Sequence, residues 1–140
     1  MTNEQVCLVQ ESFRDVFPIR MAAAKIFYER LFAMEPKLRA LFGSDMDKQG
    51  TMLMTTLSLV LHGLDRLDTI QPTVSGLARR HVYYGVEEHH YALVGQALIE
   101  TLAAALGSAF TAEVRTAWQA AYGMLAAVMI KAAAEETMAA

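Results

Sequence analysis

Residues 72–95 read PTVSGLARRHVYYGVEEHHYALVG, and this stretch decides the fold. Within it, Val74, Leu77 and His81 recur at intervals of three and four residues, so they share one stripe of a helix. A short loop follows His81, and a long helix is expected over about 87–107. The stretch therefore predicts two helices joined by a short loop, with one imidazole on an apolar face.

The helical pattern continues on both sides of this stretch. Thr2 and Gln5 have the spacing of a capping box, and Thr111 is a reasonable cap for the last helix. Proline suits a first helical turn, because its φ is fixed and its missing N–H would have no partner there. Helices are therefore expected after Thr2 and Pro18, in a short segment from Pro36 to Phe42, over about 47–67, from Pro72, and over about 87–107 and 111–138.

Composition agrees with an all-α chain. The 140 residues are 54% hydrophobic and 19% charged, with only 3 Pro and 8 Gly. The apolar surplus lies mostly in Ala, Leu and Met, which favour helices, rather than in β-branched residues. Such a composition excludes a disordered segment, and the length fits one domain. We therefore expect residues 1–140 to form a single all-α domain of seven or eight helices.

Charge and hydropathy exclude several classes of partner. The net charge is −3, and the 12 Lys and Arg are scattered, so no nucleic-acid partner is expected. The amino terminus lacks the pattern of a secretory signal. The two longest uncharged stretches, between Lys48 and Asp65 and between Arg115 and Lys131, are shorter than the roughly 18 residues typical of a membrane span. We therefore expect a cytoplasmic protein with no membrane span.

No motif of a self-contained enzyme is present. The sequence lacks a Gly-rich phosphate loop, a GxSxG elbow and an HExxH zinc motif. Cys7 is the only cysteine, which excludes a disulfide framework and a cysteine-based zinc site. A bound cofactor is the better route to chemistry in such a chain.

The four histidines differ in what their positions predict. His81 lies on an apolar stripe, where a buried imidazole is either a hydrogen-bonded core residue or a metal ligand. His89 and His90 could form a metal pair, but adjacent helical residues point about 100° apart, which favours solvated side chains. His62, at the end of a long helix, is expected at the surface.

The order and spacing of several short segments resemble the globin family, and more narrowly bacterial single-domain haemoglobins and the haem domain of flavohaemoglobins. The resemblance extends from about Val6 to Lys131. It rests on Phe27–Phe32, Pro36 through Leu41-Phe42, Arg80-His81, Tyr84-Gly85-Val86, His90–Gly95, Trp118 and Ala121-Tyr122-Gly123. The fold implied by this resemblance is a globin fold, with the helices packed around a haem pocket.

On the proximal side, the resemblance implies that His81 ligates the iron of haem b, iron protoporphyrin IX. Neutral imidazole is a standard axial ligand of haem iron, which fits this role. Phe42 matches the aromatic residue that globins press against the haem. Leu77, Val86 and Val94 would line the cofactor.

On the distal side, Tyr28 matches the family's distal tyrosine, whose phenol can donate a hydrogen bond to bound dioxygen. Gln49 falls where the family commonly has a distal glutamine, and Leu53 would form an apolar wall one turn later. The loop before Gln49 varies in length across the family. Lys48 or Met52 would face the pocket if the register were different.

Behind the proximal histidine, flavohaemoglobins have a Tyr and Glu pair that hydrogen-bonds the far imidazole nitrogen. Tyr91 matches the tyrosine. The glutamate position falls on Ala133, and Glu135 could replace it only if the last helix shifts or turns. Without that carboxylate, the electron-rich iron that favours peroxidase-like chemistry is not expected.

The function implied by the resemblance is reversible binding of dioxygen, and of nitric oxide or other diatomic ligands, by a monomer or homodimer. One alternative is a redox enzyme, either a nitric oxide dioxygenase or a peroxidase-like protein. Flavohaemoglobins continue into flavin- and nicotinamide-binding domains, whereas this sequence ends at Ala140, so turnover would need a separate reductase. Another alternative is a haem-based gas sensor that signals to a partner.

Overall fold

A computed structural model of the protein describes residues 1–139, with side chains through residue 136. Over that range the chain forms six α-helices and three short 3₁₀ helices and contains no strand, which confirms the all-α class. The elements in chain order are α1 (Asn3–Val16), η1 (Phe17–Ile19), α2 (Arg20–Met34), η2 (Pro36–Leu41), α3 (Met46–His62), α4 (Leu67–Tyr83), α5 (Glu88–Leu106), η3 (Gly107–Ala109) and α6 (Ala112–Ala139).

Local signals in the sequence set most of the helix boundaries. Thr2 caps α1 through the predicted capping box with Gln5. The Thr111 hydroxyl accepts a hydrogen bond from the Val114 N–H at the start of α6, as predicted. Asp45 caps α3 by accepting from the Lys48 N–H. These caps satisfy backbone donors that a helix cannot satisfy itself.

Two boundaries around Pro72 differ from the prediction. The helix expected over about 47–67 ends at His62, and a tight turn follows, in which the Arg66 N–H donates to the Gly63 carbonyl. The next helix, α4, begins at Leu67 instead of Pro72, so Pro72 lies inside it. Proline lacks only one backbone donor, so a helix that has already begun can continue through it at the expense of one hydrogen bond.

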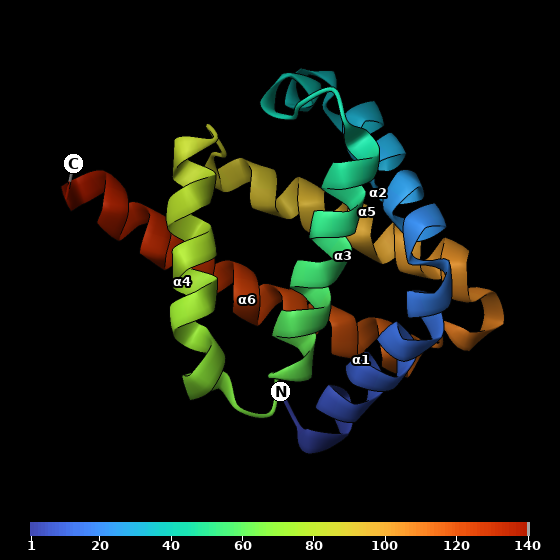
Figure 1. The fold of residues 1–140 in the computed structure, drawn as a ribbon. Coiled ribbons are helices and arrows are strands. Elements are labelled where there is room, and N and C mark those ends of the chain that lie inside the picture. Colours follow the sequence, from blue (N-terminus) through green and yellow to red (C-terminus); the bar gives the residue numbers. More distant parts are fainter. Residues whose placement is uncertain (140) are drawn as a thin grey trace.

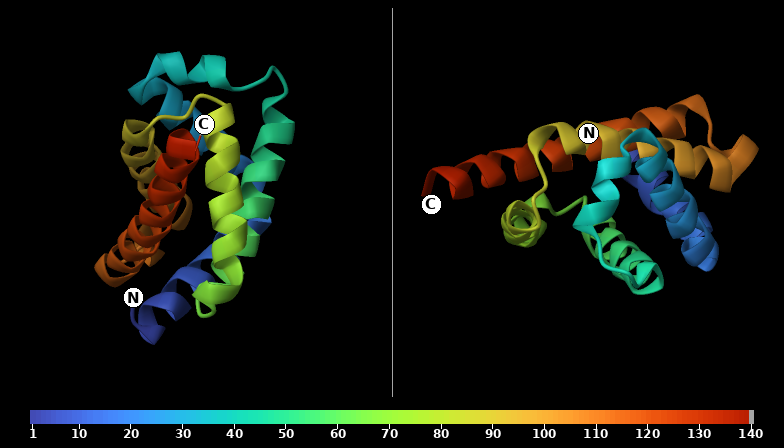
Figure 2. Two further views of the ribbon diagram at one scale, coloured as in Figure 1. Left: turned by 90° about the vertical axis from the view of Figure 1, so that its left-hand side faces the viewer. Right: turned by 90° about the horizontal axis from the view of Figure 1, so that it is seen from above.

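The helices form two layers. In Figure 1, α5 and α6 lie behind α3 and α4, and the view from above in Figure 2 shows the same separation. The main packed pairs of helices are α4 with α6, α2 with α5, α1 with α6 and α2 with α3. By contrast, α3 and α4 make almost no close backbone contacts over the described residues, although they are consecutive helices. The front layer therefore contains two neighbouring helices, α3 and α4, that pack mainly against other helices: α3 against α2, and α4 against α6.

The core is centred on Trp118 of α6. Trp118 is 1% exposed, and its indole N–H donates to the Ser12 hydroxyl of α1 at 2.8 Å. Ser12 in turn donates to the Leu8 carbonyl at 2.6 Å, so the hydroxyl both accepts and donates. These two hydrogen bonds satisfy two buried polar groups and join the first helix to the last.

Replacing Ser12 with alanine should destabilise the protein by about 1–3 kcal/mol, because the Trp118 N–H would lose its acceptor inside the core. Chemical denaturation monitored by Trp118 fluorescence measures the change. Ser44→Ala is a matched control, since Ser44 is exposed in the loop before α3. Equal stability of the two variants would contradict the assigned role of the Ser12 hydroxyl.

One segment, Glu88–Ala109, is long and apolar enough to cross a membrane by length and composition alone. Six residues of α5 are nevertheless buried within the fold: His90, Tyr91, Ala97, Leu98, Thr101 and Leu102. The helix packs against α2 and α6. Core packing therefore accounts for part of the apolar character of α5.

Candidate functional site

His81 lies in the last turn of α4 with one ring nitrogen already bonded. Its Nδ1 is 2.6 Å from the Leu77 carbonyl oxygen. Because a carbonyl can only accept, Nδ1 carries the proton, and the neutral ring keeps a free lone pair on Nε2. Burial lowers the pKa of His81, with a smaller effect from the charge of Arg80, and the bond to Leu77 opposes the shift. The ring is therefore held as the neutral tautomer that ligates metals through Nε2.

Apolar residues predicted to contact a cofactor are all half-buried. They come from the end of η2, from α3, α4 and α5, and from the loop between α4 and α5: Phe42, Leu53, Leu77, Val94 and Val86. Protein packing alone leaves part of each side chain exposed, and α3 and α4 do not close on one another. An apolar group inserted among them would bury surface that otherwise contacts water.

Tyr28 of α2 is buried in an aromatic cluster. Its ring centroid is 5.0 Å from that of Phe27, 5.8 Å from that of Phe32 and 5.3 Å from that of Phe42. These contacts fix the ring, and a cavity of about 270 Å³ between α2 and the start of α3 reaches it. Burial raises the pKa of Tyr28, so its hydroxyl stays protonated and can donate a hydrogen bond.

Gln49 and Leu53 lie one turn apart on α3, and both are half-buried. The Gln49 side chain lies close enough to Tyr28 to lower the pKa of the tyrosine, although burial has the larger, opposite effect. Lys48 and Met52, the alternatives for this position, are both exposed. The structure thus places Gln49, rather than its neighbours, beside the tyrosine.

Tyr91 is buried on α5. The hydrogen bond that His81 makes in the structure is to Leu77 and not to Tyr91. His81 Nδ1 is bonded to the Leu77 carbonyl, which lies one helical turn earlier and is therefore always within reach. The backbone carbonyl of Tyr91 accepts a hydrogen bond from the Tyr122 hydroxyl of α6 at 2.6 Å. Burial raises the pKa of Tyr91, so its phenol is protonated. Glu135, the possible substitute for the family's glutamate, is exposed.

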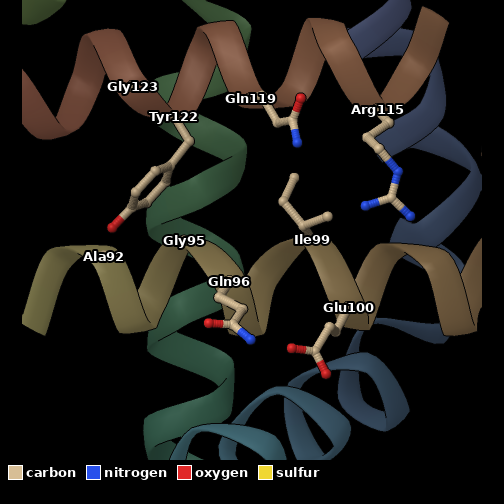
Figure 3. Close-up of a pocket in the computed structure, with 9 residues that line it drawn as sticks. All are labelled: Ala92, Gly95, Gln96, Ile99, Glu100, Arg115, Gln119, Tyr122 and Gly123. Atoms are coloured by element: carbon tan, nitrogen blue, oxygen red, sulfur yellow. The ribbon is translucent and has the colours of Figure 1, made fainter. Parts of the chain in front are cut away.

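Sequence reasoning did not find the role of Tyr122. A Cβ added at Gly95 would come within 2.7 Å of the Tyr122 ring, so a glycine is needed there for the ring to pack on α5. Figure 3 shows this ring at one end of a groove of about 520 Å³ between α5 and α6. None of the predicted site residues lines this groove. Gly95 and Tyr122 lie on different helices, so no pattern within one helix indicates that they pack together. This is why the sequence did not predict the contact.

The three other histidines occupy two different environments. His62 and His89 are exposed, as predicted. His90 was expected to be solvated, but it is only 9% exposed, and its Nδ1 accepts a hydrogen bond from the Glu87 N–H at 2.9 Å. That bond turns His90 back over the start of α5, which overrides the 100° spacing of adjacent helical residues. Of the described histidines, only His81 lies on α4, on the same helix as the buried Val74.

The residues present fit a haem group. His81 supplies a neutral imidazole nitrogen, the ligand type of globin iron. The half-buried apolar residues on four different elements supply a surface that a flat, apolar macrocycle would cover. Tyr28 and Gln49 place polar hydrogen-bonding groups on α2 and α3, which pack against each other.

Comparison with known proteins gives the family. The family model described as Globin matches residues 25–129. The chain is 29% identical to a flavohemoprotein of Vibrio cholerae over 93% of its length and 34% of that protein, and 35% identical to a flavohemoprotein of Bordetella parapertussis over 78% of its length and 28% of that protein. It is also 28% identical to a neuroglobin of Dissostichus mawsoni, over 87% of this chain and 86% of that protein.

Solved structures show the same fold. A bacterial globin from Campylobacter jejuni superposes with a TM-score of 0.86 at 23% identity, over 96% of this chain and 97% of that one. An engineered carbene transferase, a candidate nitric oxide dioxygenase from Rhodothermus marinus, also gives 0.86, at 24% identity over 96% and 94% of the two chains. The chain spans about a third of the length of the flavohemoproteins that it matches. The predicted globin fold is confirmed, and the chain belongs to the globin family.

Proposed function

We propose that this chain binds haem b through His81 and reversibly binds dioxygen, nitric oxide or a similar diatomic ligand on the side of Tyr28. The observation that carries the proposal is the 2.6 Å bond from His81 Nδ1 to the Leu77 carbonyl, which leaves Nε2 free. Haem supplies a redox-active iron that binds diatomic gases. Phe42, Leu53, Leu77, Val86 and Val94 would exclude water around it.

Tyr28 and Gln49 would hold the ligand on the distal side. The Tyr28 hydroxyl is protonated because burial raises its pKa, so it can donate to a ligand oxygen that carries partial negative charge. Gln49 is near enough to orient this hydroxyl, and its amide can itself donate. The rings of Phe32 and Phe42 keep the tyrosine in place.

A second candidate is nitric oxide dioxygenase activity with electrons from a separate reductase, supported by the flavohemoprotein relatives and by the distal tyrosine. Peroxidase-like chemistry is less favoured. The partner of His81 is a neutral carbonyl, which gives the ring less imidazolate character than a carboxylate would. Stopped-flow mixing of the oxygenated ferrous protein with nitric oxide separates the two functions: rapid consumption supports the dioxygenase, and its absence leaves a ligand-binding protein.

Localisation and assembly belong to the same proposal. We propose that residues 1–140 act as one globin domain in the cytoplasm, as a monomer or homodimer, and without a nucleic-acid partner. The family match over residues 25–129 supports the globin domain, and the scattered positive charges support the absence of a nucleic-acid partner. Light scattering of the haem-loaded protein measures the oligomeric state.

Haem removal should lower the thermal stability of the protein, because the half-buried apolar residues lose their partner. A ligand present at 1,000 times its Kd adds about 4 kcal/mol of stability. For a domain of this size that corresponds to an increase in Tm of roughly 14 °C. Differential scanning calorimetry with and without haem measures the shift. Equal Tm values would contradict the proposed cofactor site.

A further inference from the structure

Three side chains at the start of α5 form a cluster apart from the site described above. Glu87, His89 and His90 each offer a ligand atom, and these atoms lie within 4.8 Å of one another. The ring centroids of His89 and His90 are 4.2 Å apart. Glu87 Oε2 is 3.8 Å from His89 Nδ1. Two imidazoles and a carboxylate thus meet on one corner of the fold.

Backbone geometry produces this convergence. The Glu87 N–H donates to His90 Nδ1 at 2.9 Å, which holds the His90 ring over the residue that precedes the helix. His89 follows Glu87 by two positions, and its ring turns towards both partners. The cluster is therefore formed by local structure and does not depend on a distant element.

Access and charge both allow a cation to bind there. The side chains of His89 and Glu87 are 62% and 70% exposed, so two of the three donors are open to solvent. The positive end of the α5 dipole opposes a cation. Three carboxylates offset this effect: Glu87 itself, the adjacent Glu88, and Glu35, which lies close enough to His90 to raise its pKa.

We propose that Glu87, His89 and His90 bind a divalent transition-metal ion of the Zn²⁺ type. Imidazole nitrogen with carboxylate oxygen is a ligand set that suits Zn²⁺, Ni²⁺ and Cu²⁺, and three protein ligands leave a position for water. Mg²⁺ and Ca²⁺ prefer oxygen ligands and are excluded by the two imidazoles.

Binding has a consequence for the start of α5. If the metal takes His90 Nδ1, it displaces the Glu87 N–H. If it takes Nε2, the neutral ring must carry its proton on Nδ1 and can no longer accept that N–H. Either route loses one hydrogen bond, so we expect micromolar rather than nanomolar affinity for Zn²⁺.

Isothermal titration of the haem-loaded chain with Zn²⁺ alone tests the proposal. Haem keeps His81 from competing; if haem does not load, the His81→Ala variant is titrated instead, so the result is independent of the proposed function. We expect one equivalent of Zn²⁺ to bind, at least tenfold more weakly in His89→Gln and in Glu87→Gln. His89 is exposed, so its replacement leaves the fold intact.

His62→Gln is the matched control, because His62 is another exposed histidine, at the end of α3. This variant should bind Zn²⁺ as the unmodified chain does. A Zn²⁺ affinity that is unchanged in His89→Gln, equal losses in His89→Gln and His62→Gln, or no detectable binding would each overturn the proposal.

Discussion

Replacing His81 with alanine should abolish the sharp Soret band of protein-bound haem and leave only the broad absorption of free haem. His81 presents a neutral imidazole with Nδ1 bonded to the Leu77 carbonyl and Nε2 free, and alanine offers no ligand atom. Loss of a group that only orients a metal ligand typically costs 10–100-fold in affinity, so loss of the ligand itself should cost more than about 100-fold. Absorption spectra of purified protein, titrated with haem, measure the effect.

Two controls make this result specific. His62→Gln removes an exposed histidine on α3 and should leave the Soret band unchanged. Free imidazole added to His81→Ala should restore a band, because it can occupy the space of the missing side chain. A wild-type chain with no Soret band would end the haem proposal, and an unchanged spectrum in His81→Ala would assign the iron to another ligand.

Replacing Tyr28 with phenylalanine should accelerate dioxygen release by about 10- to 100-fold. The Tyr28 hydroxyl is buried, protonated and held by the rings of Phe32 and Phe42, so it is preorganised to donate. A hydrogen bond to a partly charged ligand contributes about 1.5–3 kcal/mol, which corresponds to this range of rates. Stopped-flow displacement of dioxygen by carbon monoxide from the ferrous protein measures the rate.

The matched control for Tyr28 is Tyr83→Phe, since Tyr83 is 85% exposed at the end of α4. Its release rate should equal that of the unmodified chain. Gln49→Leu tests the second distal donor. A normal rate in Tyr28→Phe together with fast release in Gln49→Leu would transfer the donor role from the tyrosine to the glutamine.

The sequence predicted helices where periodicity and capping are both strong. The starts of α1 and α6 were predicted from Thr2 with Gln5 and from Thr111, because a cap acts through bonds within one turn. The predicted start of α4 was wrong, because Pro72 is a local signal for a first helical turn but lies inside the helix. A helix nevertheless begins five residues earlier, after the turn at Gly63–Arg66.

One pair of side chains in the site meets through a contact between helices, whereas two other hydrogen bonds form within a single helical turn. Tyr28 and Gln49 are 21 positions apart in sequence and meet only because α2 packs on α3. Tyr91 was expected to bond His81, whereas the Leu77 carbonyl occupies that nitrogen. His90 was expected in solvent, yet the Glu87 N–H turns it inward.

The sequence by itself determined the helical class, most helix ends and the candidate residues, because these follow from periodicity, capping and residue chemistry within a few turns. Only the tertiary structure decided which groups from different helices meet and which apolar side chains stay half-buried. Those outcomes depend on the packing of α4 against α6 and of α2 against α3, which leaves α3 and α4 apart. Packing between distant segments has no local signature, so the partner of Tyr28 became visible only in three dimensions. The tautomer of His81 and the Glu87–His90 cluster are set within one helical turn, but the sequence alone did not show which of the groups within reach would bond.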